Sequence, residues 1–259
     1  MPVTTRAIKL DNEGIIMRYF TKQWYVDSLI SDMCFQLRKT EKAGEYSDKF
    51  FEKLYAVEEK AYLRFSKRSS KLGHLPFDEK AVRAEFASNY KDNLEFVKAN
   101  LPNDILSDVK DIRVLALGSA THEIAMRITR FCGKKNRLCE SAERKYNDAS
   151  EEADEKLRGF VTKTLFELVG APISLLSGCG DGNATLTTSH EKAGTAIKVS
   201  FENAQIVECD ESIIGTTVLK YEILTRDGGG YEFSILSIGE GLDLYTATIV
   251  CDSIEAEEI

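Results

Sequence analysis

The amino-acid sequence predicts an α+β protein, with an N-terminal α-helical domain followed by a smaller, mostly antiparallel β-rich domain. Apolar residues recur every three to four positions in the first part of the chain and alternate with polar residues in the last part. The charge changes at the same place. Residues 1–170 hold 30 basic and 27 acidic residues, a net of +3, whereas residues 171–259 hold 4 and 15, a net of −11. We therefore expect a helical domain over residues 17–170 and an acidic β-rich domain over residues 171–259, after a mobile arm of residues 1–16.

The first three predicted helices begin at residues that favour helix N-termini. Each apolar stripe follows a polar side chain able to cap a helix, namely Thr21, Ser47 or Asp78. The third helix is expected to end at Asn100, because Pro102 follows it. The tyrosines and phenylalanines on these stripes are interpreted as core residues.

The next stretch of the helical domain contains one open alternative. Residues 103–118 fit either a helix or a buried strand over Val114–Leu117. A helix is expected from residue 121 to residue 131, with an interruption near Gly133. Helical spacing then continues from residue 138 to residue 168.

The last part of the chain is expected to form a sheet of about four or five strands. Alternation predicts strands at residues 195–201, 217–224 and 231–238, and residues 244–250 are apolar and β-branched. The sequence Asp-Gly-Gly-Gly at residues 227–230 predicts a hairpin between two of these strands.

Composition and motif spacing argue against several classes of site. The cysteines include no Cys-x-x-Cys motif and the N-terminus has no apolar leader, which predicts reduced thiols in a cytoplasmic protein. His122 and Glu123 resemble the start of a zinc-protease motif, but Met126 occupies the place of its second His. Residues 178–183 lack the full pattern of a dinucleotide or calcium loop. We therefore expect no metal and no cofactor. We also expect no membrane partner, since no apolar stretch is long enough to span a bilayer.

Several segments resemble a family of uncharacterised bacterial proteins catalogued as domain of unknown function 4085. The resemblance rests on residues 17–25 (MRYFTKQWY), Leu101-Pro102, residues 111–118, residues 221–223 and residues 230–233. Ser234 stands where the closing motif of the family is expected to have a His. The resemblance covers most of the chain from Met17 and implies organisation rather than an activity.

These observations favour an uncharacterised, non-catalytic protein-binding or regulatory protein. The acidic part of the chain is expected to repel nucleic acid and to attract a basic protein partner, unless its charge serves only solubility. Weak candidates for partner contact are Glu208, Asp210 and Glu211. An immunity-type inhibitor of a basic toxin is a narrower form of this hypothesis.

The alternative is an enzyme with a small-molecule site in the cleft between the two predicted domains. Its candidate residues are Arg113, His122, Glu123, Cys179 and His190. Spacing alone assembles no catalytic group from them, so we assign no catalytic residue from the sequence.

Overall fold

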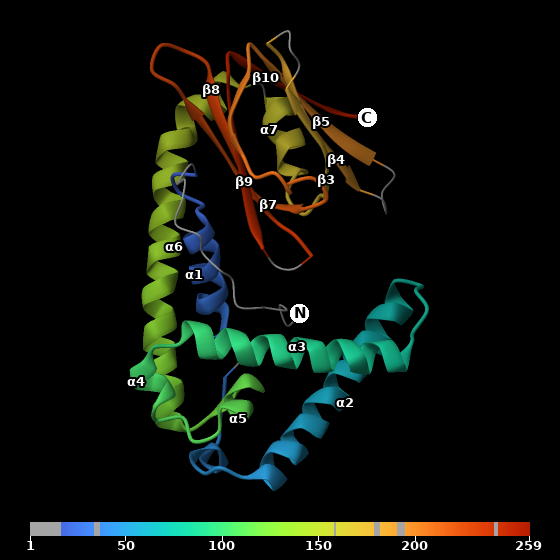
Figure 1. Cartoon of the computed structure of the whole chain (residues 1–259), viewed down its shortest axis with the longest axis vertical. Coiled ribbons are helices and arrows are strands. Elements are labelled where there is room, and N and C mark those ends of the chain that lie inside the picture. The colour runs from blue at the N-terminus through green and yellow to red at the C-terminus, as the bar shows by residue number, and fades with distance from the viewer. Residues whose placement is uncertain (1–16, 34–36, 158, 179–181, 191–194, 241–242) are drawn as a thin grey trace. The chain divides into compact units, whose positions relative to one another are not determined.

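The structure is a computed structural model with helices in the N-terminal part of the chain and antiparallel sheets in the C-terminal part (Figure 1). It describes residues 17–33, 37–157, 159–178, 182–190, 195–240 and 243–259. The predicted α+β class is therefore confirmed. The arm expected at residues 1–16 lies outside the described residues. Among the described helices, none is long and apolar enough to cross a membrane.

The described chain divides into two compact units. The first unit contains residues 28–136, and the second contains residues 17–27 together with residues 137–259. The boundary expected at residue 170 lies near the change from helix to strand at Ile173. Whether that position separates domains that fold on their own stays a prediction.

The helical elements begin where the capping residues predict. The elements up to the long sixth helix are α1 (Lys22–Met33), β1 (Arg38–Lys39), the 3-10 helix η2 (Glu41–Gly44), α2 (Asp48–Leu72), α3 (Glu79–Asn100), α4 (Asn103–Leu106), α5 (Ile112–Ala116), β2 (Ser119–Ala120) and α6 (His122–Lys156). The Ser47 hydroxyl accepts a hydrogen bond from the backbone N–H of Phe50, and the Asp78 carboxylate accepts from Lys80 and Ala81. These bonds satisfy backbone donors that the first turn of a helix leaves unpaired.

Residues 112–116 form the helix α5 and not a strand, which settles the open alternative. The Asp111 carboxylate caps this helix by accepting from the backbone N–H of Arg113. The sequence was ambiguous because consecutive residues of this short helix, Val114, Leu115 and Ala116, are all buried. An interior strand would show the same continuous run of apolar residues.

The interruption expected near Gly133 is wrong, because α6 runs through it without a break. One interior glycine costs only about 1 kcal/mol relative to alanine, which a 35-residue helix tolerates easily. The break comes later instead. Helix α6 ends at Lys156 and α7 (Gly159–Phe166) begins after it, so the apolar spacing continues across two helices.

The described residues of the C-terminal part form eight strands, not the four or five expected. They are β3 (Ile173–Gly178), β4 (Ala184–His190), β5 (Thr195–Glu202), β6 (Gln205–Cys209), β7 (Thr217–Thr225), β8 (Tyr231–Ile238), β9 (Leu244–Cys251) and β10 (Ser253–Glu258). The expected hairpin joins β7 and β8. Strands β3, β4, β6 and β10 were not expected, because each carries many polar residues and so lacks a strong apolar alternation.

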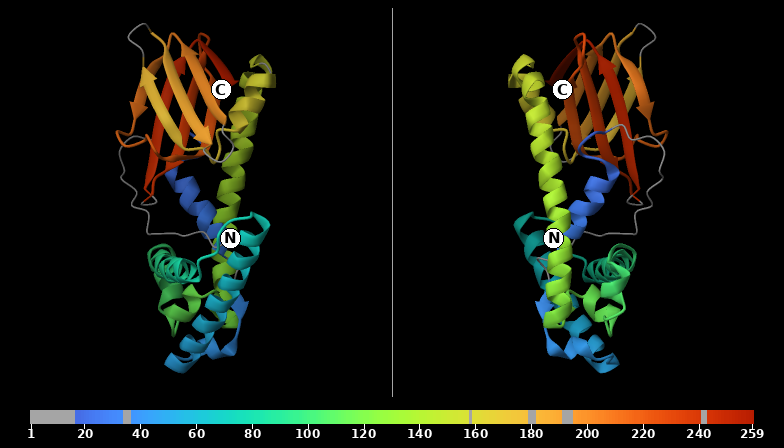
Figure 2. Two further views of the ribbon diagram at one scale, coloured as in Figure 1. Left: turned by 90° about the vertical axis from the view of Figure 1, so that its right-hand side faces the viewer. Right: turned by 90° about the vertical axis from the view of Figure 1, so that its left-hand side faces the viewer.

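These strands form two four-stranded antiparallel sheets, in the orders β10-β5-β4-β3 and β6-β9-β8-β7. Figure 2 shows the sheets as facing layers. They meet at one edge, where the backbone N–H of Ile173 donates to the carbonyl of Thr216 at 2.8 Å. Side chains from both sheets fill the space between them, including Phe201 from one and Phe233 from the other, whose ring centroids lie 5.1 Å apart.

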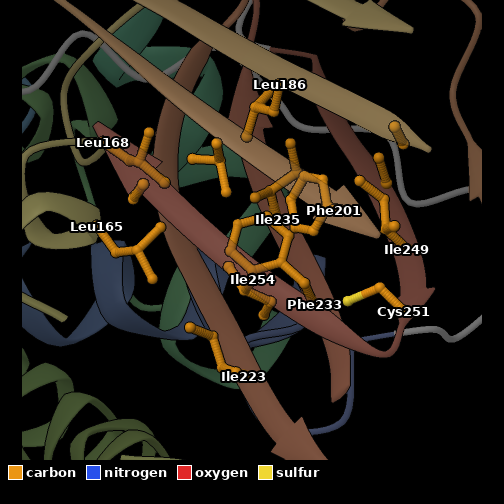
Figure 3. Close-up of a cluster of buried hydrophobic side chains, with 14 of the residues drawn as sticks. Leu165, Leu168, Leu186, Phe201, Ile223, Phe233, Ile235, Ile249, Cys251 and Ile254 are labelled. Carbon is orange, nitrogen blue, oxygen red and sulfur yellow. The ribbon is translucent and has the colours of Figure 1, made fainter. Parts of the chain in front are cut away.

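Helix α7 completes this core. Leu165 and Leu168 have no exposed surface and belong to the same buried cluster as Leu186, Ile235 and other strand residues (Figure 3). The helix packs against β10 and β5. A residue range beginning at 171 therefore omits part of the hydrophobic core of the sheets.

Candidate functional site

One candidate site is a cavity of about 520 Å³ within the first unit. Its walls come from the end of α1, from α2 and α3, and from the segment around α5. We call it the α2–α3 cavity and define it by its aromatic lining residues Tyr62, Phe65, Phe86, Tyr90 and Phe96 with the aliphatic residues Leu29, Met33, Leu37, Ala61, Val97, Leu115, Ala116 and Leu117. Its volume falls within the range of small-molecule sites, roughly 300–1,000 Å³.

Aromatic contacts between α2 and α3 build one wall of this cavity. Tyr55 packs edge-on against Phe86 and Tyr90, with centroid separations of 5.1 and 5.3 Å. Tyr62 contacts the same Phe86 ring at 5.6 Å. Residues 55 and 62 are two helical turns apart and so share one face of α2, which aligns the rings along α3.

The interpretation of these aromatic residues as core holds only in part. Phe86 and Phe96 are buried, whereas Phe65 is 52% exposed and no residue of α2 is fully buried. A pair of helices buries only the seam between them, so aromatic side chains beside that seam remain accessible. This is why an apolar stripe becomes a cavity wall here.

Two tyrosines supply neutral hydroxyl groups to the cavity. The Tyr62 hydroxyl donates to Glu85 at 2.7 Å and accepts from the Asn89 amide at 3.2 Å. Burial, followed by the Glu85 contact, raises the pKa of Tyr62 to about 12, and burial raises the pKa of Tyr90 to about 12. Both phenols are therefore protonated at neutral pH and suit hydrogen bonding rather than proton abstraction.

An ion pair borders the same cavity. The Arg38 guanidinium lies 2.6 Å from Oε1 of Glu58. This oxygen is buried, and the guanidinium is its neighbour of opposite charge. Arg38 and Glu58 therefore form a charge-matched pair at the border of the cavity, and the buried Oε1 is not accessible to a ligand.

A smaller cavity of about 300 Å³ lies elsewhere in the first unit. Its lining includes Gly44, Asp108, Asp111, Glu123 and Thr121. The neighbouring Arg113 is held in place, because it donates to Asp111 and to Asp48, each at 2.8 Å. We favour the α2–α3 cavity, because it is larger and combines apolar walls with a few polar groups.

The candidate catalytic residues do not form a described reaction centre. Arg113 also stacks on the Tyr46 and Phe51 rings, at 4.4 and 4.6 Å, and its ion pairs raise its pKa, so it acts as a structural cation. His122 and Glu123 are exposed at the start of α6. Cys179 and the side chain of His190 lie outside what the structure describes. No group of three metal-ligating side chains occurs among the described residues.

The three acidic candidates for partner contact have different environments. Glu211 is exposed and Glu208 is half-buried. Asp210 accepts a hydrogen bond from the backbone N–H of Thr246 at 2.6 Å and pairs with Lys22 at 3.3 Å. Asp210 therefore has a structural role that must be kept when the surface is tested.

A buried carboxylate that sequence reasoning missed lies in the second unit. Glu222 is 1% exposed and accepts hydrogen bonds from the backbone N–H groups of Arg18, Tyr19 and Phe20 at 3.0, 2.8 and 2.6 Å. The available sequence signal was a glutamate placed between Tyr221 and Ile223 in a predicted strand. These bonds join two of the segments on which the family resemblance rests, residues 17–25 and 221–223.

Ser234 is buried on β8, and its hydroxyl lies 2.8 Å from that of Thr248 on β9. This position therefore forms a cross-strand polar pair inside the sheet. Comparisons of the chain with protein-family models, with curated proteins and with solved structures find no match.

Proposed function

We propose that this chain is a non-catalytic, regulatory binding protein whose ligand occupies the α2–α3 cavity. The observation that carries the proposal is the lining itself, which combines aromatic walls with protonated tyrosines and the Arg38–Glu58 pair. The volume of about 520 Å³ suits a small molecule.

The lining indicates an amphipathic ligand with an aromatic or branched aliphatic body. The flat rings of Phe86 and Phe96 favour apolar groups, since burying apolar area drives binding to such walls. The polar part of the ligand would face the Arg38–Glu58 pair, whose residues both line the cavity. The Tyr90 hydroxyl is a further group that would contact the polar part of the ligand.

The non-catalytic class is supported by the chemistry of the lining. The tyrosines of the cavity hold their protons at neutral pH, and Arg38 and Glu58 neutralise each other. No histidine or cysteine lines the cavity among the described residues. The groups present orient and bind a molecule more readily than they transfer its protons.

The fluorescent aromatic amphiphile 8-anilinonaphthalene-1-sulfonate tests this site. We expect saturable, one-to-one binding to the folded full chain, with a blue-shifted emission. Replacing Ala61, which lines the cavity, in Ala61→Phe fills the space and should weaken binding at least tenfold. Ala56→Phe is the matched control, because Ala56 is an exposed residue of the same helix outside the lining.

Circular dichroism and urea unfolding must show that both variants keep the fold. If the phenylalanine disturbs α2, the smaller substitution Ala61→Met replaces it in the binding test. Equal binding by the Ala61 and Ala56 variants would place the probe elsewhere and contradict the proposal. Binding that is not saturable would contradict it as well.

A second candidate function is recognition of a basic protein by the acidic C-terminal part. The observation in its favour is the exposure of acidic side chains along the edge strand β10, where Glu255, Glu257 and Glu258 are all exposed. The double variant Glu208→Gln/Glu211→Gln tests the residues predicted from the sequence and leaves the structural Asp210 intact. Loss of a basic partner in pull-downs at low salt would support this function, and unchanged capture would remove these two residues from it.

A further inference from the structure

The outer face of α2 carries a stripe of positive charge. Seven exposed basic side chains make up this cation stripe, which consists of Lys49, Lys53, Lys60, Arg64, Lys67, Arg68 and Lys71. At 3.6 residues per turn they fall within an arc of about 100° and extend over about 33 Å of the helix. The spacing therefore places all seven cations on one side of a single helix, with the exposed Val57 between Lys53 and Lys60.

The stripe points away from the aromatic seam. The rings that contact α3 come from Phe51, Tyr55 and Tyr62, on the opposite side of the helix. None of the seven cations forms an ion pair with a described residue, although Lys67 lies 5.9 Å from the ring centroid of Phe77. Their charges are consequently available to an external anion.

The acidic residues of α2 lie outside this arc. They are Asp48, Glu52, Glu58 and Glu59. Glu58 pairs with Arg38, and Glu59 pairs with Arg83 of α3. A helix with mixed charges on its solvent face would be the ordinary solubilising arrangement, whereas here the two signs are separated.

Exposed leucines accompany the cations at the C-terminal end of α2. Leu72 is 73% exposed and Leu75, in the loop before α3, is 60% exposed. Both follow closely after Lys67 and Lys71. Basic side chains beside exposed leucines are the combination that favours the interface of an anionic lipid bilayer.

We propose that the cation stripe and the two leucines dock this protein on the surface of an anionic membrane. The lysines and arginines contact lipid headgroups, and Leu72 and Leu75 enter the boundary between headgroups and acyl chains. The surface requires no membrane-spanning helix. The proposal differs from the expectation of no membrane partner, which rested on the absence of a spanning segment.

The shape of the stripe favours a flat anionic surface over nucleic acid. A straight helix can place all seven cations against a plane. The backbone of a B-form duplex instead winds through a full turn in about 34–36 Å, so a straight stripe of about 33 Å would meet phosphates at only part of its length. Exposed leucines also have no role in contacts to phosphate.

The net charge of the whole chain is −8, so attraction to an anionic surface must be local. At 0.1 M salt, charges are screened over about 10 Å. The headgroups in contact with α2 therefore experience mainly the stripe. Each cation near such a surface increases partitioning about fivefold, and the effect weakens with salt.

Co-sedimentation of the full chain with vesicles tests the proposal. The vesicles contain either phosphatidylcholine alone or phosphatidylcholine with 30% phosphatidylserine, at 0.1 and 0.5 M NaCl. We expect binding only to the phosphatidylserine vesicles, weakened at the higher salt. The stripe variant Lys60→Glu/Arg64→Glu/Lys67→Glu/Lys71→Glu should bind at least a hundredfold less.

The matched control reverses four exposed lysines of the first unit that lie off the stripe. It is Lys42→Glu/Lys91→Glu/Lys110→Glu/Lys134→Glu, which has the same net charge as the stripe variant. This control should retain most of the binding. The separate variant Leu72→Ser/Leu75→Ser should bind about five- to tenfold less while keeping its salt dependence.

Three outcomes would overturn the proposal. One is the absence of binding to phosphatidylserine vesicles by the wild-type chain, and another is an equal loss in the stripe variant and its control. The third is binding to a duplex DNA probe that depends on the stripe without binding to vesicles, which would assign the surface to nucleic acid. Urea unfolding of each variant separates these results from loss of fold, and the cavity probe reports independently on the proposed function.

Discussion

Glu222 shows how one buried charge can organise a segment that lies far from it in sequence. Its carboxylate accepts three consecutive backbone N–H groups from residues 18–20, just before α1. Burial raises the pKa of Glu222, and the three donors oppose that rise without cancelling it. Lys220 on the same strand lies 5.1 Å from the ring centroid of Phe20, which adds a second contact to this segment.

Removing the Glu222 carboxylate should destabilise the second unit strongly. Glu222→Ala leaves three buried donors without an acceptor and should lower the free energy of unfolding by about 3 kcal/mol. Glu232→Gln is the control, because its partner Arg18 has a side chain that is 58% exposed, and we expect a change below about 0.5 kcal/mol. Urea unfolding measures both. If both variants lowered the free energy of unfolding by similarly small amounts, the three hydrogen bonds would contribute little to stability.

The raised pKa of Glu222 predicts how the stability of the protein changes with pH. Because the folded-state pKa of Glu222 is raised above its ordinary value, its contribution to stability is largest at low pH. That contribution is lost as the pH rises from the unfolded-state pKa through the folded-state pKa. Glu222→Gln does not titrate, so the stability of the wild type relative to this variant should fall as the pH rises above about 4.5, the ordinary pKa of a glutamate. A rise in this relative stability with pH would mean that the three hydrogen bonds lower the pKa of Glu222 more than burial raises it.

Among the elements, the β7–β8 hairpin depends on backbone conformations that favour glycine. Gly228, Gly229 and Gly230 have φ values of 92°, 105° and 79°. Gly230 also lies against the Cys251 carbonyl oxygen of β9, where a Cβ atom would overlap that oxygen. The turn is therefore constrained both by its own conformation and by a neighbouring strand.

The two constraints can be separated by alanine substitution. Gly230→Ala should lower the free energy of unfolding by about 2–4 kcal/mol, through backbone strain together with the overlap. Gly228→Ala has open space around its Cβ position and should cost only about 1 kcal/mol from strain. Thermal and urea unfolding give both values. Equal costs would show that β9 shifts to accept the new methyl group.

Helix α6 offers the opposite case of a glycine with no conformational requirement. Gly133 lies inside the helix, and a Cβ atom there would meet no atom within 4 Å. Gly133→Ala should raise the free energy of unfolding by up to about 1 kcal/mol, because it reduces the entropy of the unfolded chain. A loss of stability on urea unfolding would indicate that the helix is not regular at this position.

For the whole molecule, the core of the sheets extends beyond the residues that form strands. Ala153, Leu157, Val161, Leu165 and Leu168 all belong to the buried cluster between and beside the sheets. They come from the end of α6 and from the α7 region. The charge boundary near residue 170 and the boundary of this core are therefore at different positions in the chain.

This difference predicts the behaviour of fragments. A fragment of residues 171–259 should lack a cooperative unfolding transition, because it exposes the apolar surface that these helical residues cover. A fragment of residues 150–259 should recover part of the β-sheet circular dichroism and of the transition. Cooperative unfolding of the shorter fragment would show instead that the sheets form an independent domain from residue 171.

Local patterns in the sequence predicted much of the fold but little of the candidate site. Capping by Ser47 and Asp78 and the glycine-rich hairpin were predicted because those residues act on their immediate neighbours. Strands β3, β4, β6 and β10 were missed because their many polar residues weaken the apolar alternation that marks a strand. The α2–α3 cavity was not predicted, since a stripe of aromatic residues has the same spacing whether a partner helix covers it fully or in part.

The sequence by itself determined the α+β class, the starts of the main helices and the separation of charge, because these follow from residue spacing and composition. Only the tertiary structure decided that Glu222 meets residues 18–20, that helical residues complete the core of the sheets, and that an unfilled space remains beside Phe86. The physical reason is that each of these features depends on side chains far apart in the chain. Their packing in three dimensions is set by the whole set of contacts and not by local preference.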